Sequence, residues 1–453
     1  MRALSRMRLE PTATWPATRP QEANMRTARP RSAMVASLAA VSALVLAACG
    51  SDEDGADPNG EITLTINVFG DSFSLPDNRE LYDEYEKLHD NITIKENRSD
   101  FGTHHQNLQA RLTAGSGAAD LEVIEVGQVS GYIGQPDKFT NFKDQDVDTS
   151  QWTESTVQRA STADGGTLIG LPTDIGGLAM CYRTDLFAQA GLPTKREDVS
   201  ALWSTWDDYV DVGDRFVQKV PKVKWFDAGG HVFTGILGND EETFYNADGE
   251  LIVESNDAVR DAWDLTVAAI KDGQSAALPE FSPEWNTGFQ QGQFATITCP
   301  AWMMGYIQAN AAETKGKWDI ATIPGGSGNW GGSYVTVPSQ GKNIDAAAEL
   351  AKWLTAPEQN VKLFKTIGNF PSQTSTWTQP EVADFTSEFF NNAPAGKIFP
   401  ASLENAPVQV YGPQSGVIGN TFSGALNSVE QGTDADEAWE SAMNDIKAAA
   451  GDG

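Results

Sequence analysis

Apolar and polar positions alternate along residues 62–69, and this pattern predicts a half-buried β-strand. Two shorter runs of apolar and β-branched residues, 92–94 and 121–126, predict two further strands. The two segments between these strands have apolar residues at helical spacing instead. An order of strand, helix, strand, helix and strand predicts parallel strands with helices on the faces of the sheet.

The helices are predicted from apolar residues three and four positions apart and from signals at the helix ends. Asp77 and Glu80 have the spacing of a capping box, and the helix after them is predicted to bury Leu81, Tyr82, Tyr85 and Leu88. The second helix, near 105–114, is predicted to end at the glycines that follow it. The same periodicity predicts later helices over 203–217, 257–271, 344–354, 357–367 and 434–449.

Two features could suggest a metal site, and each has a simpler interpretation. His104 and His105 are adjacent, so in a helix their side chains diverge by about 100°, and we expect polar surface residues. Residues 246–249 resemble part of a calcium loop, but Phe244 stands where the first ligand is needed, and a hairpin turn is predicted. No CxxC motif occurs. We therefore expect neither a metal nor a cofactor.

The amino-terminal residues have the features of an export signal, predicted over 1–48. Arg26, Arg29 and Arg31 precede an apolar run from 33 to 48 that ends in Leu-Ala-Ala-Cys. This run is shorter than the ~20 residues of a spanning helix. Its ending resembles a bacterial lipobox, which implies cleavage before Cys49 and a diacylglycerol group on that residue. The alternative is an ordinary signal peptide with an incidental cysteine.

Two further segments near the amino terminus carry no folding signal. Residues 1–24 add nothing to the export signal, and Met25 would make a well-proportioned start, so the first segment is interpreted as an over-extended reading frame. Residues 49–60 are rich in acidic residues and glycine and contain no apolar side chain larger than alanine after the cysteine. Such a composition is typical of a flexible tether.

The charge of the chain limits its partners. Its 453 residues contain 32 Lys and Arg against 62 Asp and Glu, a formal net charge of -30. A protein this acidic is repelled by nucleic-acid phosphates and by anionic lipid surfaces, so we expect no nucleic-acid partner. At this length the chain can form two or three domains, each with a core of its own.

The cysteines fit an oxidising compartment. With Cys49 lipidated, Cys181 and Cys299 remain, and both lie in apolar segments that read as strands. Neighbouring strands would bring the two sulfurs within bonding range. The alternatives are therefore a disulfide and two buried free thiols.

Five groups of motifs in order resemble the extracellular solute-binding proteins (family 1) of carbohydrate ABC importers, the group that contains the maltose-binding proteins. The resemblance covers nearly all of 61–449 and is carried by several short motifs. These are Leu-Thr-Ala-Gly-Ser-Gly at 112–117, Leu-Pro-Thr-Asp at 171–174 with Ala-Gly-Leu-Pro at 190–193, Phe-Gln-Gln-Gly at 289–292 with Pro-Ala-Trp at 300–302, Ile-Pro-Gly-Gly at 323–326 with Trp-Gly-Gly-Ser at 330–333, and the helix at 346–354 with Phe-Pro at 370–371.

The resemblance implies an α/β fold of the two-lobed periplasmic-binding-protein type (type II). Each lobe would be a mostly parallel sheet flanked by helices, with a ligand cleft between the lobes. Lobe one would comprise 61–172 and 331–370, and lobe two 178–325 and 371–453. The function implied is that of a monomeric, non-enzymatic receptor. It would be lipid-anchored at the outer face of the bacterial cytoplasmic membrane, bind a sugar and deliver it to an ABC permease.

Candidate ligand contacts follow from the chemistry of a sugar. Aromatic rings pack against its C–H face, while planar polar groups bind its hydroxyls. Trp302 and Trp330 occupy loops at family positions that face the cleft, and Trp285 lies in a further loop; the alternative for each is structural packing. The polar candidates follow predicted strands or lie at the crossing between lobes, and helix or turn capping is their alternative role. They are Asp71, Glu125, Gln128, Asp174 and Asp227, with Tyr411 as a weaker candidate.

Other function classes are less well supported by the sequence. The motifs GxSxG, HExxH and GxxxxGK[ST] do not occur, so those hydrolase, zinc-protease and nucleotide signals are missing. Two alternatives remain. One is a binding lipoprotein for a non-sugar solute such as a polyamine, a peptide or a phosphorylated polyol. The other is a surface glycosidase, because some pair among the many carboxylates could act as its acid and base.

Overall fold

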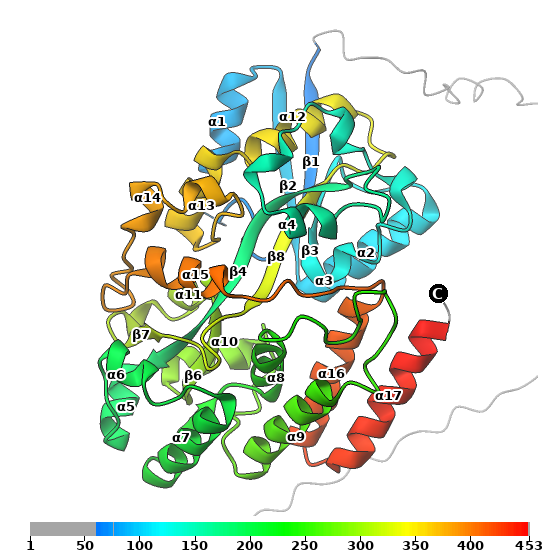
Figure 1. Ribbon diagram of the computed structural model, residues 1–453. Coiled ribbons are helices and arrows are strands. Elements are labelled where there is room, and N and C mark those ends of the chain that lie inside the picture. Colours follow the sequence, from blue (N-terminus) through cyan, green and yellow to red (C-terminus); the bar gives the residue numbers. More distant parts are fainter. Residues whose placement is uncertain (1–59, 76, 452–453) are drawn as a thin grey trace, which may run out of the picture. The chain divides into compact units, whose positions relative to one another are not determined.

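The computed structural model describes residues 60–75 and 77–451, all within one compact unit of the chain, Asp57–Gly453 (Figure 1). The predicted export signal and Cys49 lie outside the described residues, as does the predicted tether except for Gly60. Within the described ranges, no helix is both long and apolar enough to cross a membrane.

The strands of the described residues form one mixed sheet. Their bounds are β1 Ile62–Phe69, β2 Ile92–Ser99, β3 Leu121–Glu125, β4 Gly170–Arg183, β5 Lys224–Phe226, β6 Phe294–Pro300, β7 Trp318–Ala321 and β8 Asn329–Thr336. Their order is β2-β1-β3-β8-β4-β6-β5, and β7 pairs with β4. The first half of β4 pairs with β8, and the second half pairs with β6 and β7. In Figure 1, β4 and β8 run side by side through the middle of the molecule.

The direction of the strands differs from the predicted mostly parallel sheets. β1, β2 and β3 are parallel, as predicted, because a helix connects each to the next. β8 is antiparallel to β3 and to β4, and β4 is antiparallel to β6 and β7. Of the lobe-two pairs, β5 and β6 are parallel. The antiparallel pairs arise because β4 and β8 run between the two halves of the fold and are not linked as strand–helix–strand units.

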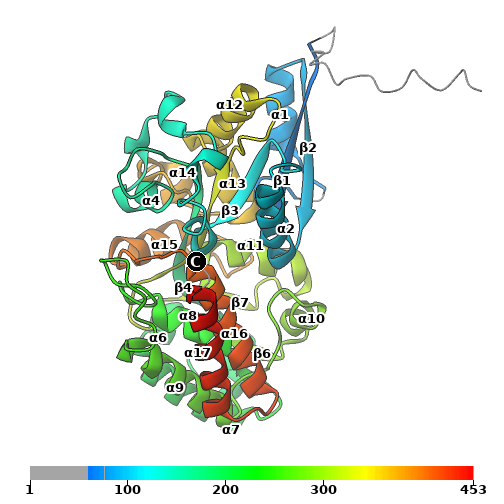
Figure 2. The same ribbon diagram turned by 90° about the vertical axis from the view of Figure 1, so that its right-hand side faces the viewer.

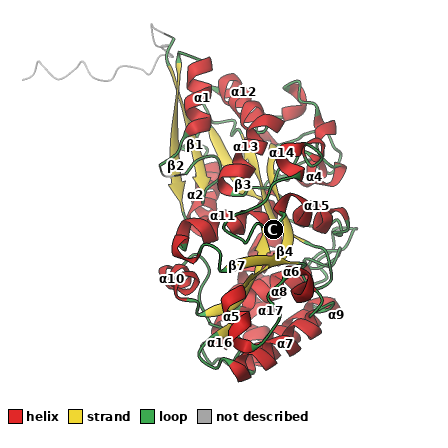
Figure 3. Cartoon of the chain, turned by 90° about the vertical axis from the view of Figure 1, so that its left-hand side faces the viewer, coloured by secondary structure: helices red, strands yellow, loops and turns green. Residues whose placement is uncertain are grey.

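Helices surround the strands (Figures 2 and 3). Their bounds are α1 Glu80–Leu88, α2 Phe101–Ala114, α3 Val126–Val129, α4 Glu154–Arg159, α5 Thr184–Ala190, α6 Arg196–Ser200, α7 Trp206–Lys219, α8 Gly229–Leu237, α9 Asp257–Lys271, α10 Pro283–Gln291, α11 Ala301–Asn310, α12 Ile344–Leu354, α13 Pro357–Ile367, α14 Pro380–Ala383, α15 Ala395–Glu404, α16 Ser415–Glu430 and α17 Ala435–Gly451. Figure 2 shows α16 and α17 packed side by side in the lower half.

The buried apolar side chains of the described residues define two lobes. One cluster draws on 64–171 and 334–367, and we name the part of the fold around it lobe one. Three clusters lie within 178–446 and form the core of lobe two. β8 contributes to both, because Tyr334 lies in the core of lobe one while Trp330 packs against two clusters of lobe two. The residue-by-residue lobe boundaries stay predictions.

Most predicted elements are present, with corrections at the first helix. β1, α9, α12 and α13 have the predicted bounds. The predicted cap at Asp77 is wrong, because α1 begins at Glu80 and the Asn78 side chain accepts a hydrogen bond from the Glu80 amide at 3.0 Å. Leu88 is also not buried, being 68% exposed in the last turn of α1. The predicted turn at 246–249 is confirmed by the antiparallel bridge between Tyr245 and Leu251.

His104 and His105 are buried, which corrects the expectation of surface residues. His104 Nε2 lies 2.6 Å from the Val123 carbonyl oxygen, and His105 Nδ1 lies 2.9 Å from that of Phe101. The Glu125 amide donates to His105 Nε2 at 3.2 Å. Burial lowers the pKa of His105 to about 3, so its ring is neutral and can accept this bond. The histidine therefore fixes the end of β3, where a candidate ligand contact lies.

Cys181 and Cys299 form a disulfide, which decides between the two alternatives. Cys181 lies in β4 and Cys299 in β6, and these strands are antiparallel neighbours. The bond joins residues 118 positions apart in sequence. It ties the crossing strand β4 to the strand that leads directly into α11.

Candidate ligand-binding site

Two candidate carboxylates lie in one row across three strands. Ser333 of β8 pairs with Glu125 of β3 on one side and with Asp174 of β4 on the other. Residues directly opposite each other in antiparallel strands point to the same face of the sheet. Glu125 and Asp174 are both half-buried, and Thr173 Oγ1 donates to Asp174 Oδ1 at 2.8 Å. The pairing therefore brings both acids to one face at the strands that join the lobes.

The electrostatics of these two acids place their titration near neutral pH. Burial raises the pKa of Glu125 to about 7, although the Gly127 amide donates to its carboxylate at 2.7 Å. The charges of Asp174 and Glu280 add to this rise. Burial likewise raises the pKa of Asp174 to about 6. Each carboxylate is thus held in surroundings that favour a proton or a hydrogen-bond donor.

Two tryptophans form an aromatic surface that includes part of β8, the strand that joins the two acids. Trp330 and Trp302 do not lie in loops as predicted. Trp330 stands on β8 three residues before Ser333, and Trp302 is in the first turn of α11. Their ring centroids are 5.6 Å apart in an edge-to-face arrangement, and both side chains are half-buried. Gly331 has φ 86°, and a Cβ on it would lie 3.2 Å from Trp302 Nε1, so glycine allows this indole to rest against β8. The half-buried tryptophans and the acids joined by β8 together provide apolar and polar binding groups.

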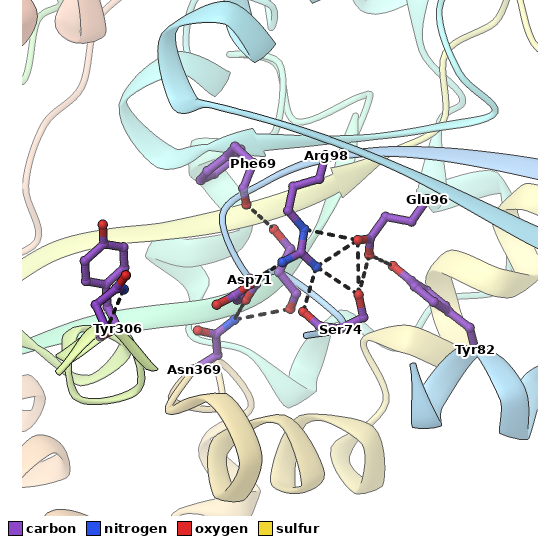
Figure 4. Close-up of polar contacts among 10 residues, drawn as sticks. Phe69, Asp71, Ser74, Tyr82, Glu96, Arg98, Tyr306 and Asn369 are labelled. Carbon is purple, nitrogen blue, oxygen red and sulfur yellow. Dashed lines mark hydrogen bonds and ion pairs between the residues drawn. The ribbon is translucent and has the colours of Figure 1, made fainter. Parts of the chain in front are cut away.

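Asp71 is held by a polar network in the turn after β1 (Figure 4). Arg98 of β2 forms an ion pair with Asp71, donates to Glu96 at 2.8 Å and donates to the Ser74 carbonyl at 2.9 Å. Asn369 donates to the Asp71 carbonyl at 3.2 Å. Burial, together with the charge of Glu96, raises the pKa of Asp71 even though the Arg98 guanidinium lowers it. The network fixes a partly exposed carboxylate at the carboxyl end of β1.

Asp71 faces a residue of lobe two. In Figure 4 it lies between Arg98 and Tyr306, which belongs to α11. Burial, assisted by the charges of Glu280 and Asp71, raises the pKa of Tyr306 to about 12. The Tyr306 hydroxyl donates to Asn286 Oδ1 at 2.7 Å. Asp71 therefore belongs to the same region as the aromatic surface, across the junction of the lobes.

Two candidates are placed in the core instead. Asp227 and Trp285 have no exposed surface, and Trp285 lies in α10 rather than in the predicted loop. Trp285 Nε1 donates to Asp227 Oδ2 at 2.7 Å, and the same oxygen pairs with His231 Nδ1. Neither residue therefore has a surface open to a ligand in this structure, and their ligand contact stays a prediction. Both contact His231, whose ring centroid lies 4.9 Å from that of Trp330, so they adjoin the aromatic surface through this histidine.

Gln128 and Tyr411 lie at the contact between lobe one and the segment before α16. The Gln128 amide fills the space where a Cβ on Gly416 would be, so it packs closely against the start of α16. The guanidinium of Arg159 lies 5.2 Å from the centroid of the Tyr411 ring. Burial raises the pKa of Tyr411 to about 12, with a contribution from the charge of Glu125. Both residues thus lie near Glu125. Gln128 packs against α16, and Tyr411 is close enough for the charge of Glu125 to affect its pKa.

Residues 80–389 match the family described as bacterial extracellular solute-binding protein. The chain belongs to this family. The match spans residues of both lobes and includes Glu125, Asp174, Trp302 and Trp330.

Individual relatives of this solute-binding protein agree with the family. It is 27% identical over 380 residues to an arabinooligosaccharide-binding protein of Bacillus subtilis, covering 77% of this chain and 82% of that one. A crystal structure of an extracellular solute-binding protein family 1 member shares 41% identity and a TM-score of 0.74, covering 86% of this chain and all of that one (100%). A binding protein from B. animalis subsp. lactis, in complex with β-1,6-galactobiose, has the same fold at 18% identity, with a TM-score of 0.72 over 85% of this chain and 96% of that one.

Sequence reasoning missed four residues that lie near the candidates: Arg98 beside Asp71, Glu280 near Glu125, Phe281 near Trp302, and Tyr306 near Asp71. One of them has a usable signal, since Tyr306 follows Trp302 by four positions and therefore lies on the same face of α11. The others depend on tertiary contacts. In the described part of the chain, no group of three or more His, Cys, Asp or Glu is arranged to hold a metal ion.

Proposed function

We propose that this solute-binding protein binds an oligosaccharide between its lobes and delivers it to the membrane permease of an ABC importer. The observation that carries the proposal is that one strand, β8, contributes Trp330 to the aromatic pair with Trp302 and also joins Glu125 to Asp174 through Ser333. The indole rings offer faces for the C–H surface of a sugar, and the carboxylates accept hydrogen bonds from its hydroxyls. The B. subtilis relative, whose name specifies arabinooligosaccharide binding, supports this ligand class.

The proposed location is the outer face of the bacterial cytoplasmic membrane, with the protein attached as a monomer through Cys49. The lipobox-like sequence at 46–49 supports this proposal. The net charge of -30 means that the protein itself is repelled by anionic lipids, so attachment depends on the acyl chains.

Replacing Cys49 with serine tests the anchor. We expect Cys49→Ser to abolish incorporation of a radiolabelled fatty acid, because serine lacks the thiol that carries the diacylglycerol group. The control is Ser51→Ala, two residues further on, which should be labelled like the wild type. Equal labelling of Cys49→Ser and the wild type would contradict lipidation at this residue.

The ligand class is tested with the full protein purified from membranes in detergent. Intrinsic tryptophan fluorescence and melting temperature are measured against arabinotriose, maltotriose, galactobiose and lactose, with spermidine, glycerol phosphate and a tripeptide as non-sugar probes. A micromolar or tighter sugar Kd with the sugar recovered intact is the expected result. Binding of only a non-sugar probe would replace the carbohydrate proposal, and release of shorter sugars would indicate a glycosidase.

The affinity for the sugar is expected to fall by about tenfold from pH 8 to pH 5. Glu125 and Asp174 have pKa values of about 7 and 6 in the free protein, and ionised carboxylates accept stronger hydrogen bonds than neutral ones. Both pKa values are raised by burial, so ionisation of these acids destabilises the free fold as pH rises through 5 to 7. Affinity and the contribution of these acids to stability therefore change in opposite directions.

The measurement is Kd by fluorescence titration from pH 5 to pH 8, with melting temperature recorded alongside. Glu125→Gln and Asp174→Asn should each flatten part of the pH profile. As a matched control, the exposed carboxylate of Asp148 in lobe one is replaced in Asp148→Asn, which should leave the profile unchanged. A wild-type Kd that is constant over this range would show that the two acids do not bind the ligand.

A further inference from the structure

We infer that the 278–282 segment, between α9 and α10, is an additional ligand-contacting part of the site. In this inference Phe281 provides a further ring for stacking and His231 is a positioning residue that holds the segment through Glu280. The inference rests on the proposed function and deepens it, because another aromatic platform selects a ligand of more than one sugar ring.

Phe281 has an unusual combination of backbone and exposure. Its φ is 59°, in the left-handed region that aromatic residues rarely adopt, and its side chain is 43% exposed. Such a conformation is unfavourable for a residue with a side chain and persists only where the surroundings enforce it. The surroundings here include hydrogen bonds from the Leu278 amide to the Asp227 carbonyl and from the Ser282 amide to the Pro279 carbonyl, both 3.1 Å. A large apolar ring is therefore presented toward solvent at an energetic cost.

The Phe281 ring continues the aromatic surface of the site. Its centroid lies 6.3 Å from that of Trp302 and 5.5 Å from that of Tyr306. Trp302 in turn lies 5.6 Å from Trp330. The three exposed or half-buried rings Phe281, Trp302 and Trp330 thus follow one another as neighbours. If each of two neighbouring aromatic rings stacks one sugar ring, the ligand contains at least two sugar units. The inference therefore specifies disaccharides and longer oligosaccharides.

His231 connects this segment to the platform of Trp330. The imidazole is buried, its Nδ1 pairs with Asp227, and its Nε2 lies 3.2 Å from Glu280 Oε1. Burial lowers the pKa of His231, but the charges of Asp227 and Glu280 outweigh this and raise it to about 10. The ring is therefore a cation at neutral pH, held between two carboxylates and 4.9 Å from the Trp330 ring. Glu280, the residue before Phe281, thus lies within ion-pair distance of the imidazole that contacts the Trp330 ring.

Glu280 keeps part of its side chain available to a ligand. It is 35% exposed even though one oxygen faces His231. Its charge also contributes to the raised pKa values of Glu125 and Tyr306, so its field reaches the row of acids and α11. The segment thus joins a polar acceptor, Glu280, to an exposed aromatic ring, Phe281.

The test compares Kd for arabinotriose and maltotriose with Kd for arabinose and glucose, using the full protein in detergent. Phe281→Ala should weaken trisaccharide binding by about tenfold and change monosaccharide binding by less than about twofold. Phe281→Tyr, which retains the ring, should bind like the wild type, and Phe281→Leu tests the ring if the alanine variant does not fold. Leu88→Ala is the matched control, because Leu88 is an exposed apolar residue on α1 of lobe one.

The role of His231 is tested by the same ratio of affinities. His231→Gln and Glu280→Gln should both lower the preference for the trisaccharide, whereas a purely structural role would weaken all sugars equally. An unchanged ratio in Phe281→Ala and Phe281→Leu, with normal wild-type binding, overturns this inference alone. Absence of wild-type binding to every sugar of the panel, with binding of a non-sugar probe, overturns the proposed function together with it.

Discussion

Replacing both Cys181 and Cys299 with alanine is expected to lower the free energy of unfolding by about 4–5 kcal/mol. The disulfide joins residues 118 positions apart, and closing so long a loop removes much conformational entropy from the unfolded chain. Both sulfurs are buried between β4 and β6, so the alanine variant also loses packing in the core of lobe two. The measurement is urea-induced unfolding without ligand, followed by circular dichroism.

Two controls separate the cross-link from the packing. The wild type unfolded in the presence of a reductant loses the cross-link but keeps both sulfur atoms, so it isolates the entropic part of the effect. Cys181→Ala alone leaves Cys299 as a free thiol and should be as destabilised as the reduced wild type or slightly more. If the reduced wild type unfolds at the same urea concentration as the oxidised protein, the cross-link contributes nothing to stability.

The elements predicted correctly from the sequence are those whose signals are local. α13 starts at Pro357 and ends before Gly368, which has φ 86°, and both residues act at their own positions in the chain. α9 and α12 have regular apolar periodicity between polar ends. Two residues before α1 have side chains that can cap a helix, Asp77 and Asn78. The Asn78 side chain accepts the hydrogen bond from the Glu80 amide. Boundaries of this kind depend on single hydrogen bonds that spacing alone does not decide.

Burial of polar residues could not be predicted because it depends on distant partners. His104 and His105 lie in the core because β3 supplies a carbonyl acceptor to one and an amide donor to the other. Asp227 is buried because two side chains bind one of its carboxylate oxygens. Trp285 is distant in sequence, whereas His231 lies only four residues away. The sequence identifies these residue types as suitable for chemistry, but only the packing decides which of them reach the ligand.

The placement of the candidate carboxylates at strand ends was predictable from the sequence, and that of the proposed contact Phe281 was not. Glu125 and Asp174 were expected at a strand end and at the crossing, and the pairing of Ser333 with both brings them together. Trp302 and Trp330 lie next to motifs rich in glycine and proline, which constrain the backbone around them. Phe281 depends on a left-handed conformation that its own residue type disfavours, so no sequence rule points to it.

Removing either tryptophan of the aromatic surface is expected to weaken sugar binding by about ten- to a hundredfold, which corresponds to about 1.4–2.8 kcal/mol. Trp302→Ala removes the ring that lies against Gly331, and Trp330→Ala removes the ring between Trp302 and His231. In each case a stacking face for one sugar ring is lost, while Glu125 and Asp174 stay in place. The measurement is Kd by isothermal titration calorimetry with the tightest trisaccharide of the panel.

A half-buried tryptophan elsewhere separates ligand stacking from stability. Trp353 of α12 packs against Tyr85 of lobe one, with ring centroids 5.2 Å apart, and is partly exposed like Trp302 and Trp330. Trp353→Ala should therefore lower the melting temperature without changing Kd. Trp302→Ala should instead raise Kd by far more than its loss of stability explains. Normal affinity in both Trp302→Ala and Trp330→Ala would place the ligand on other residues, even though the chain belongs to the solute-binding family. A loss of affinity in Trp353→Ala equal to that of the other two would instead mean that general destabilisation, not stacking, weakens binding.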